Sequence, residues 1–291
     1  MQIGVITKNE NSWCSRKIIK YFKSKDAQIV AFSLPEVVAR VGFKPESEVR
    51  GINIKSLDGI LVRPIGPGSL DEIIFRIDIL HRIGRLGVPV TNSPFAIERA
   101  ADKYFTLTLL EDNGIPIPRT LVTESVPDAM ETFSQFGKEV VIKPIFGSRG
   151  LGITRTSDSD VARRICTMLS YNHFVLYLQE FVQHGNRDIR TMVVGDKVVA
   201  AMYRKCDGWK TNISQGATPI AFKPDEEMEA LSIKASKAVG CEIAGVDIME
   251  SENGLLVHEI NSQPGFRGLQ IASEVNVAGE IADYIIQKTK R

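Results

Sequence analysis

The chain has 291 residues, and its 36 basic and 35 acidic side chains leave a formal net charge of +1. This balance excludes a global electrostatic field that would recruit nucleic acid or an anionic membrane, so any phosphate site must be local. With 43% hydrophobic residues, the chain can bury a large core and form two or three compact units.

No apolar run is long enough to span a bilayer, and the N-terminus has no basic prefix before a long apolar core. We therefore expect a cytoplasmic protein without a membrane or nucleic-acid partner. The four cysteines form no C-x-x-C pair, which argues against a zinc site and a disulfide framework. The four histidines show no metal-ligand spacing, and we interpret all of them as incidental.

Residues 1–95 alternate between predicted strands and helices. Four short apolar runs predict strands, at 2–7, 27–32, 59–62 and 88–91. A capping box from Ser69 to Glu72 opens a helix that Gly87 should close. This alternation predicts an N-terminal α/β domain with a parallel sheet covered by helices. The loop at 63–68 leaves its strand at the carboxyl end, the usual ligand position, although a stiff turn explains it at least as well.

Two further units are predicted, at 96–185 and 186–291. The first begins with helices to about Asn113 and continues as a small mixed sheet with helices. The second contains a long antiparallel hairpin, a helix at 226–239 and a final helix at 278–288. The predicted fold class is therefore α/β, with α+β character in the C-terminal half.

Lys143 is a cation inside an apolar strand and needs an anionic partner. The loop GSRGLG (147–152) follows directly, and its glycines would let backbone amides wrap an anion, with Arg149 in support. The loop matches neither a Walker A motif nor a G-x-G-x-x-G fingerprint, and a flexible hairpin tip is the alternative. We favour phosphate binding because the lysine and the loop occur together.

Polar residues also end the strands that follow. Glu180 is either an edge charge or a hydrogen-bond acceptor for a ligand whose base contacts the neighbouring backbone. Arg190 and Arg204 lie at the two ends of the hairpin away from its turn, so they should be close in space. Arginine suits planar carboxylate or phosphate recognition, but two solvated strand-end charges fit the pattern equally well.

Asp247, Glu259 and Asn261 place three oxygen ligands in apolar surroundings. A buried carboxylate must be paired, protonated or bound to a metal. We expect a three-residue loop at 252–254, with Gly254 left-handed, because it sets Asp247 directly across from Glu259 and puts Asn261 on the same face. The set suits Mg²⁺, and structural salt bridges to arginine or lysine are the alternative.

Together these parts could hold a nucleoside triphosphate and transfer its terminal phosphoryl group. The chain resembles the ATP-grasp superfamily and, more closely, the RimK-like α-L-glutamate ligases. The resemblance covers nearly the whole chain through short motifs in a fixed order: DKYFT (102–106), VVIKP (140–144), GSRGLG (147–152), QEFV (179–182), DIR (188–190), YRK (203–205), TN (211–212), GVDI (245–248) and HEINSQPGFRG (258–268).

This resemblance implies an ATP-grasp fold, in which an N-terminal α/β domain precedes two subdomains that clamp ATP. The residues implied to bind ATP are Lys103, Lys143, Gly147, Ser148, Arg149, Gly150, Gly152, Gln179, Glu180, Phe181, Val182 and Asp188, the last at the ribose. The implied ligands of Mg²⁺ or Mn²⁺ are Asp247, Glu259 and Asn261. The groups implied to hold the acyl phosphate and the acceptor are Arg190, Arg204 and Asn212. Lys210 stands where many relatives have arginine, which weakens any bidentate role there.

The implied reaction has two steps. An acceptor carboxylate attacks the γ-phosphate of ATP, and the amine of L-glutamate then displaces phosphate from the acyl phosphate. The chain is most similar to archaeal members that use tetrahydromethanopterin, while the methanogen deazaflavin coenzyme and a ribosomal protein C-terminus are alternative acceptors. The near-neutral charge favours a small coenzyme over a protein. Another ATP-grasp peptide synthetase and a non-catalytic nucleotide-binding protein are further alternatives, and the resemblance also implies a homo-oligomer.

Overall fold

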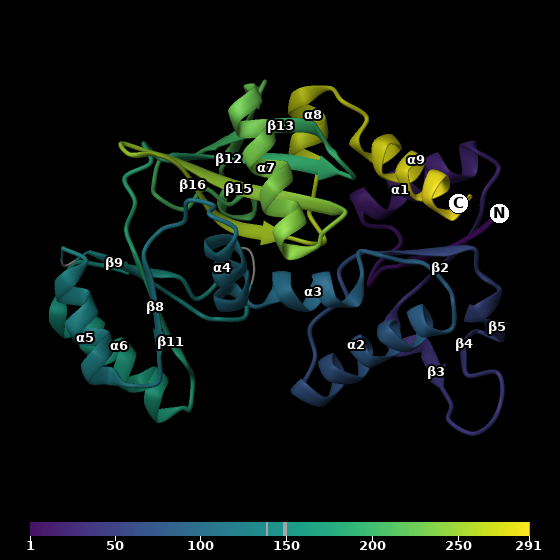
Figure 1. Ribbon diagram of the computed structural model, residues 1–291, viewed down its shortest axis with the longest axis horizontal. Coiled ribbons are helices and arrows are strands. Elements are labelled where there is room, and N and C mark those ends of the chain that lie inside the picture. Colours follow the sequence, from purple (N-terminus) through teal and green to yellow (C-terminus); the bar gives the residue numbers. More distant parts are fainter. Residues whose placement is uncertain (138, 148–149, 291) are drawn as a thin grey trace.

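A four-stranded parallel sheet forms the N-terminal part of the protein. The computed structural model describes residues 1–137, 139–147 and 150–290 (Figure 1). The strand order is β2-β1-β6-β7, and all neighbouring pairs are parallel, as predicted. The members are β1 (Gln2–Ile6), β2 (Gln28–Phe32), β6 (Gly59–Val62) and β7 (Val90–Thr91).

Helices cover both faces of this sheet. Side chains alternate along its strands, so apolar residues point to both faces and each face needs a covering layer. Val5 belongs to the core that contains α1 (Trp13–Ser24), whereas Val62 belongs to the core that contains α2 (Leu70–Arg85). Helix α2 begins at the predicted capping box, in which both reciprocal hydrogen bonds are present.

A second, smaller sheet in this part of the chain was not predicted. It has the order β3-β4-β5 and is flanked by two short 3₁₀ helices. Its elements are η1 (Leu34–Glu36), β3 (Val37–Ala39), β4 (Ser47–Val49), β5 (Ile52–Asn53) and η2 (Ile54–Ser56). Strands of two or three residues are too short to show an alternating pattern, which is why the sequence concealed them.

Two helices and a four-stranded sheet form the middle of the chain. Helix α3 (Pro94–Ala101) meets α4 (Lys103–Asp112) at Asp102, whose carboxylate accepts from the backbone N–H of Phe105 at 3.0 Å. The sheet has the order β10-β9-β11-β8, and its three pairings are all antiparallel rather than mixed, which corrects the prediction. The remaining elements are β8 (Thr120–Thr123), α5 (Val126–Gln135), β9 (Val140–Lys143), β10 (Thr154–Thr156), α6 (Ser159–Tyr171) and β11 (Leu176–Glu180).

A five-stranded antiparallel sheet with the order β14-β13-β12-β15-β16 follows. The predicted hairpin is present as β12 and β13, whereas β14 and α8 were not predicted. The elements are β12 (Arg187–Val194), β13 (Lys197–Lys205), η3 (Ile213–Gln215), β14 (Thr218–Phe222), α7 (Glu226–Val239), β15 (Ile243–Ser251), β16 (Gly254–Asn261), α8 (Arg267–Ser273) and α9 (Val277–Thr289).

The last helix returns to the start of the chain. In Figure 1, α9 lies beside α1, and the two ends of the chain are close together. Tyr21 on α1 donates a hydrogen bond of 2.7 Å to Asp283 on α9. One hydrophobic core therefore joins the first sheet, α9 and the back of the five-stranded sheet, where Met192 is fully buried.

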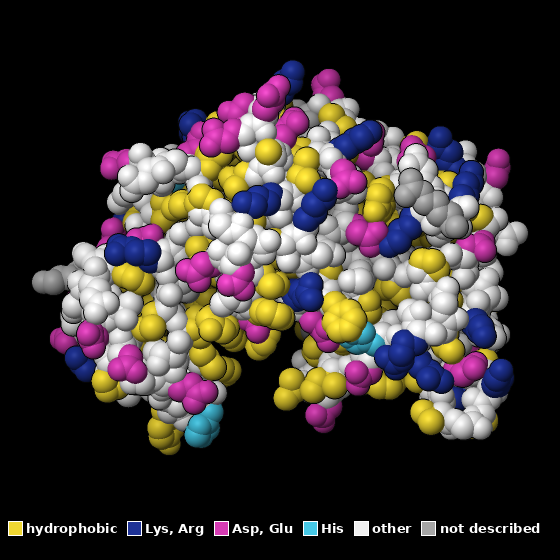
Figure 2. All heavy atoms as spheres, in the orientation of Figure 1, with side chains coloured by type: hydrophobic (Ala, Val, Ile, Leu, Met, Phe, Trp, Pro, Cys, Tyr) yellow, Lys and Arg dark blue, Asp and Glu magenta, His cyan; other side chains and the backbone are white. Residues whose placement is uncertain are grey.

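No helix in the described part of the chain is long and apolar enough to cross a bilayer. Figure 2 shows basic and acidic side chains interspersed over one face, without a large area of one sign. This pattern agrees with the net charge of +1 and leaves any anion site to local groups.

Candidate functional site

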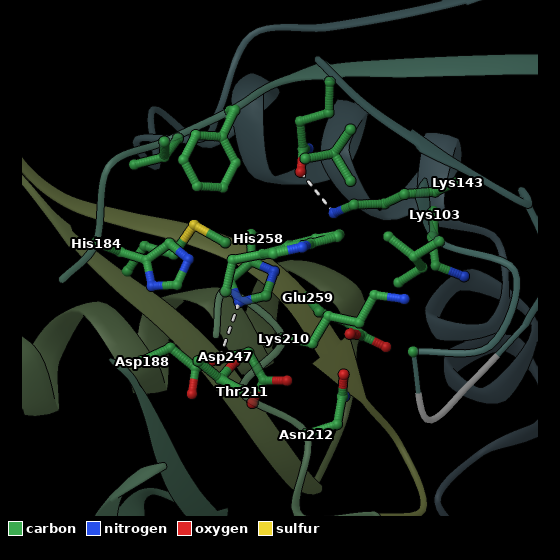
Figure 3. Close-up of a pocket in the computed structure, with 18 of the residues that line it drawn as sticks. Lys103, Lys143, His184, Asp188, Lys210, Thr211, Asn212, Asp247, His258 and Glu259 are labelled. Atoms are coloured by element: carbon green, nitrogen blue, oxygen red, sulfur yellow. Dashed lines mark hydrogen bonds and ion pairs between the residues drawn. The ribbon is translucent and has the colours of Figure 1, made fainter. Parts of the chain in front are cut away.

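A pocket lies where the four-stranded central sheet faces the five-stranded sheet, and Figure 3 shows its lining. It brings together most of the predicted site residues: Lys103, Lys143, Gly147, Gly150, Gln179, Glu180, Phe181, Val182, Asp188, Arg204, Asn212, Asp247 and Glu259. Gly152, Arg190 and Asn261 are not in the lining, although Arg190 and Asn261 contact Asp247. Ser148 and Arg149 lie outside the described residues.

Two lysines enter the pocket from different elements. Lys143, at the end of β9, donates a hydrogen bond of 2.6 Å to Gln179 Oε1 on β11 (Figure 3). Burial lowers the pKa of Lys143 to about 8, and the nearby Glu259 carboxylate only partly offsets this. Lys103, the first residue of α4, donates to the backbone oxygen of Gly147 at 3.0 Å, and burial also lowers its pKa. Two desolvated ammonium groups in one pocket favour an anionic ligand.

The hairpin that carries the predicted metal ligands forms differently from the prediction. Ser251 pairs with Gly254, so the loop has two residues, 252 and 253, not three. A β-bulge further along the hairpin adds the missing residue, and Asp247 lies directly opposite Glu259 as predicted. The expected pairing and the left-handed Gly254, with a φ of +107°, are therefore confirmed, while the expected loop length was wrong.

Asp247 is held by arginines. Arg190 donates to both of its carboxylate oxygens, with Nη2 2.7 Å from Oδ2, and Arg204 Nη2 lies 3.0 Å from the same oxygen. Burial alone would raise the pKa of Asp247, but the two guanidinium groups outweigh it and hold the pKa below its ordinary value. This is the salt-bridge arrangement that the sequence left open, and it confirms that Arg190 and Arg204 converge.

Asp188 completes a buried network of two carboxylates and two arginines. It is 1% exposed and accepts hydrogen bonds from Arg204 Nε at 2.7 Å and from Thr211 Oγ1 at 2.6 Å. Burial would raise its pKa, yet Arg204 and His258 hold it below the ordinary value. The network is balanced in charge, which stabilises both carboxylates as anions at one wall of the pocket.

Glu259 differs from its two acidic neighbours. It faces the pocket but has no ion-pair or hydrogen-bond partner among the described residues. Asn261 Nδ2 lies 3.5 Å from Asp247 Oδ2, so the three predicted ligands are adjacent. No group of three His, Cys, Asp or Glu side chains suited to a metal exists in the described ranges. The predicted metal ligands differ from such a group, because they are two carboxylates, Asp247 and Glu259, and one amide oxygen, that of Asn261.

The bulge also brings in a residue that sequence reasoning missed. His258 is the extra residue of β16. In a regular strand, neighbouring side chains point to opposite faces, but here His258 and Glu259 both line the pocket. His258 Nε2 lies 3.6 Å from Asp188 Oδ2 (Figure 3). His184 lines the pocket as well, so two of the four histidines interpreted as incidental lie at the pocket. Strand alternation would have turned His258 away, and only the bulge reveals it.

The opposite wall is aromatic. Phe181 meets Trp209 edge-on at a centroid distance of 6.2 Å, and the guanidinium of Arg155 lies 3.5 Å from the Phe181 ring centre. Glu180 is engaged at the rim, because its carboxylate accepts from Arg119 Nε at 2.6 Å. Trp209 was also missed, since a single tryptophan in a polar loop has no spacing signal.

The glycine-rich loop reaches the far side of the pocket. Gly150 has a φ of +72°, and a Cβ there would lie 2.5 Å from Asn212 Oδ1. Only glycine combines this backbone conformation with such a close approach. The loop after β9 therefore packs against the segment that carries Asn212.

The pocket between two antiparallel sheets, with lysines from two elements and a glycine-rich loop, fits what the resemblance to the ATP-grasp superfamily implies. A family model described as the RimK-like ATP-grasp domain matches residues 100–285. The tetrahydromethanopterin:α-L-glutamate ligase of Methanocaldococcus jannaschii is 38% identical over 299 residues, covering 100% of both chains. The ligase of the same name from Methanococcus maripaludis is 35% identical over 295 residues, covering 100% of this chain and 99% of its own length.

Among solved structures, the ATP-grasp ligase PsnB complexed with a phosphomimetic variant of its minimal precursor, Mg and ADP matches with a TM-score of 0.76 and 20% identity. The match covers 99% of this chain and 98% of PsnB, and it shows the fold. The chain therefore belongs to the RimK-like ATP-grasp family. It is an ATP-dependent ligase of the α-L-glutamate ligase type.

Proposed function

We propose that this ligase joins L-glutamate to a carboxylate of tetrahydromethanopterin. The observation that carries the proposal is its similarity to ligases of that name over their full length, at 32–38% identity. The similarity includes the N-terminal α/β part of the chain, which lies outside the match to the ATP-grasp family model. The similarity to these ligases therefore extends over the whole of this chain.

ATP occupies the pocket between the sheets in this proposal. Lys103 and Lys143 contact its phosphates, since both are desolvated cations that an anion would stabilise. The adenine lies against Phe181, with Trp209 as the second aromatic wall. Gly150 belongs to the loop that closes over the phosphates.

Residues at the middle of β15 and the end of β16 fit a Mg²⁺ site. Asp247, Glu259 and Asn261 are adjacent oxygen donors, and Glu259 faces the pocket without an internal partner in the described ranges. Asp247 would share its carboxylate between the metal and its arginines. The ion would supply charge neutralisation on the phosphate oxygens.

The remaining chemistry follows from the basic groups. The acceptor carboxylate attacks the γ-phosphate of ATP, and ADP leaves. Lys143 and Lys103 stabilise the negative charge that spreads over the transferring phosphoryl group. Arg190 and Arg204, held in place by Asp247 and Asp188, stabilise the acyl phosphate and the oxyanion that forms when the glutamate amine attacks.

The test is ADP release by the purified protein with Mg²⁺, ATP and L-glutamate, followed by mass spectrometry of the acceptor. Tetrahydromethanopterin, the deazaflavin coenzyme and a ribosomal C-terminal peptide are compared in parallel. We expect the mass of one or more glutamyl residues to be added to tetrahydromethanopterin. Addition to another acceptor, with none to tetrahydromethanopterin, would refute the proposed acceptor and leave the ligase class in place.

A further inference from the structure

Arg63 is a buried cation without an anionic partner. It lies directly after β6, is 4% exposed, and forms no ion pair with a described residue. Its Nη2 donates a hydrogen bond of 2.9 Å to the backbone oxygen of Pro264, and its Nε has no acceptor. The guanidinium also lies 5.6 Å from the ring centre of Phe266. Buried charges in proteins are normally paired, so this one requires an explanation.

A second arginine in the same part of the chain shows what is missing. Arg40 donates to the backbone oxygen of Pro45 at 3.2 Å, and its guanidinium lies 5.7 Å from the ring centre of Phe43. These two contacts match those of Arg63. Arg40 also binds the carboxylate of Glu48 at 2.6 Å, although it is the more exposed of the two. A carboxylate at the free Nε of Arg63 would complete the same set of contacts.

Arg63 also occupies the position where an open parallel sheet binds ligands. In the order β2-β1-β6-β7, the chain leaves β1 toward β2 on one side, and β6 lies on the other side. The carboxyl ends of β1 and β6 thus meet at a topological switch point of the sheet. Lys8, just after β1, lies along the loop that follows Arg63, with its Cδ 3.6 Å from the Cβ position of Gly66.

The segment after β16 links Arg63 to the strand that carries two of the proposed metal ligands. Pro264, which accepts the hydrogen bond from Arg63, lies three residues after Asn261. A Cβ placed on Gly245 would meet Pro264 Cβ at 2.9 Å and Arg190 Nη1 at 3.0 Å. Pro264 is therefore bonded to Arg63 through its backbone oxygen and packs beside Gly245, next to Arg190.

We propose that Arg63 binds a carboxylate of either L-glutamate or the acceptor. This contact would anchor that substrate between the N-terminal sheet and the segment after β16. This inference rests on the proposed function, because it adds a specificity contact to the same site. The carboxylate belongs either to L-glutamate or to the acceptor, and the two sources are separated by kinetics. Lys8 adds a second positive charge beside the loop that follows Arg63.

The test compares Arg63→Met, which keeps a side chain of similar length but removes the charge, with Arg63→Lys and with the matched control Arg40→Met. The KM values for L-glutamate and the acceptor are measured separately at saturating ATP. We expect Arg63→Met to raise one of them about tenfold to a hundredfold, the range of a charge-assisted hydrogen bond. Arg63→Lys should recover part of the loss, and Arg40→Met should change neither KM.

A rise in the KM for L-glutamate identifies glutamate as the source of the carboxylate, and a rise for the acceptor identifies the acceptor. Unchanged KM values in Arg63→Met, with losses only in thermal stability or ATP affinity, would show a tether for Pro264 and overturn the inference. If Arg63→Met does not fold, the same comparison is made with Arg63→Lys, and an unchanged KM for both acids overturns it.

Absence of ADP formation by the unsubstituted protein with tetrahydromethanopterin would refute the proposed acceptor without deciding this inference. In that case, titration calorimetry replaces kinetics. It measures the affinity of the protein for the carboxylates L-glutamate and glutarate, with ADP and Mg²⁺ present. The unsubstituted protein should bind at least one probe more tightly than Arg63→Met does. Equal binding, or no binding to either protein, would overturn the inference.

Discussion

At the scale of single residues, Glu259 is the member of the proposed metal set that faces the pocket without an internal partner in the described part of the chain. Glu259→Gln removes one negative charge and changes the shape of the side chain little. We expect turnover to fall by orders of magnitude while the melting temperature stays the same, because metal-assisted phosphoryl transfer depends on this charge. Steady-state ADP release and thermal unfolding measure the two quantities.

Glu250→Gln is the control for this variant. Glu250 lies on the same hairpin, but its carboxylate pairs with Arg187 and accepts from Tyr203. Its loss should leave turnover near that of the unsubstituted protein. Near-normal ADP release by Glu259→Gln would remove Glu259 from the metal site.

The pKa of Lys143 predicts how ATP binding depends on pH. Burial lowers this pKa from the ordinary 10.5 to about 8, so the ammonium is present below pH 8 and is lost as the pH rises through that value. Because phosphates favour the charged form, ATP binding at about pH 8.5 should take up protons, and affinity should fall as the pH rises further. Calorimetry in buffers of different ionisation enthalpy measures the uptake.

Lys143→Arg keeps its charge throughout this range and should therefore take up fewer protons on binding ATP. Lys143→Ala should weaken ATP binding at every pH. Proton uptake that is the same in Lys143→Arg and in the unsubstituted protein would assign the effect to another group, such as Lys103, whose pKa burial also lowers.

Residue types in the sequence were enough to identify the buried charges but not their partners. Lys143 inside an apolar strand was recognisable as a buried cation that needs a partner. The pairing of Asp188 with Arg204 was not, because it depends on which of several charged strand ends face one another. Arg63 likewise appeared only as the first residue of a loop, since its contact with Pro264 joins positions 201 residues apart.

At the scale of elements, the glycine-rich loop and Asn212 meet at Gly150. Gly150→Ala would place a Cβ 2.5 Å from Asn212 Oδ1 at a φ of +72°. We expect this variant to lower kcat and raise the KM for ATP about tenfold or more, because loop closure is displaced at the phosphates. The steady-state rate at varied ATP concentration measures both parameters.

Gly137→Ala is the matched control, since Gly137 has a φ of +75° and no atom within 4 Å of its Cβ position. It carries the same backbone strain, on the order of 1 kcal/mol, without the steric contact. Equal kinetic losses in the two variants would mean that backbone strain, and not contact with Asn212, determines the effect.

The sequence predicted the ends of helices well where a few neighbouring residues determine them. Helix α2 begins at its capping box, and α7 ends at Gly240 in the left-handed conformation. The hairpin of β15 and β16 shows the limit of such reasoning. Three residues were expected because in a regular hairpin that loop length sets Asp247 opposite Glu259, whereas a two-residue loop and a bulge produce the same pairing. A bulge depends on how the whole sheet packs, so the sequence of one hairpin does not reveal it.

At the scale of the whole molecule, the core shared by α1, α9 and the five-stranded sheet couples the two ends of the chain. The site depends on this coupling, because Arg63 comes from the N-terminal sheet and Pro264 from the segment after β16. The sequence predicted separate units in order, but it could not show that the last helix packs on the first sheet. That contact arises from the tertiary fold and has no short-range signal.

Ile281, fully buried on α9, tests this coupling. Ile281→Ala should cost about 2 to 5 kcal/mol of unfolding free energy, the usual range for truncating a buried isoleucine. Because the core is shared, calorimetry should show the N-terminal and C-terminal parts melting together at a lower temperature. Ile271→Ala, at a position 58% exposed on the neighbouring α8, should shift the melting temperature little. Two separate transitions, of which Ile281→Ala moves only one, would show that the N-terminal sheet unfolds independently and that the shared core does not hold Arg63 against Pro264.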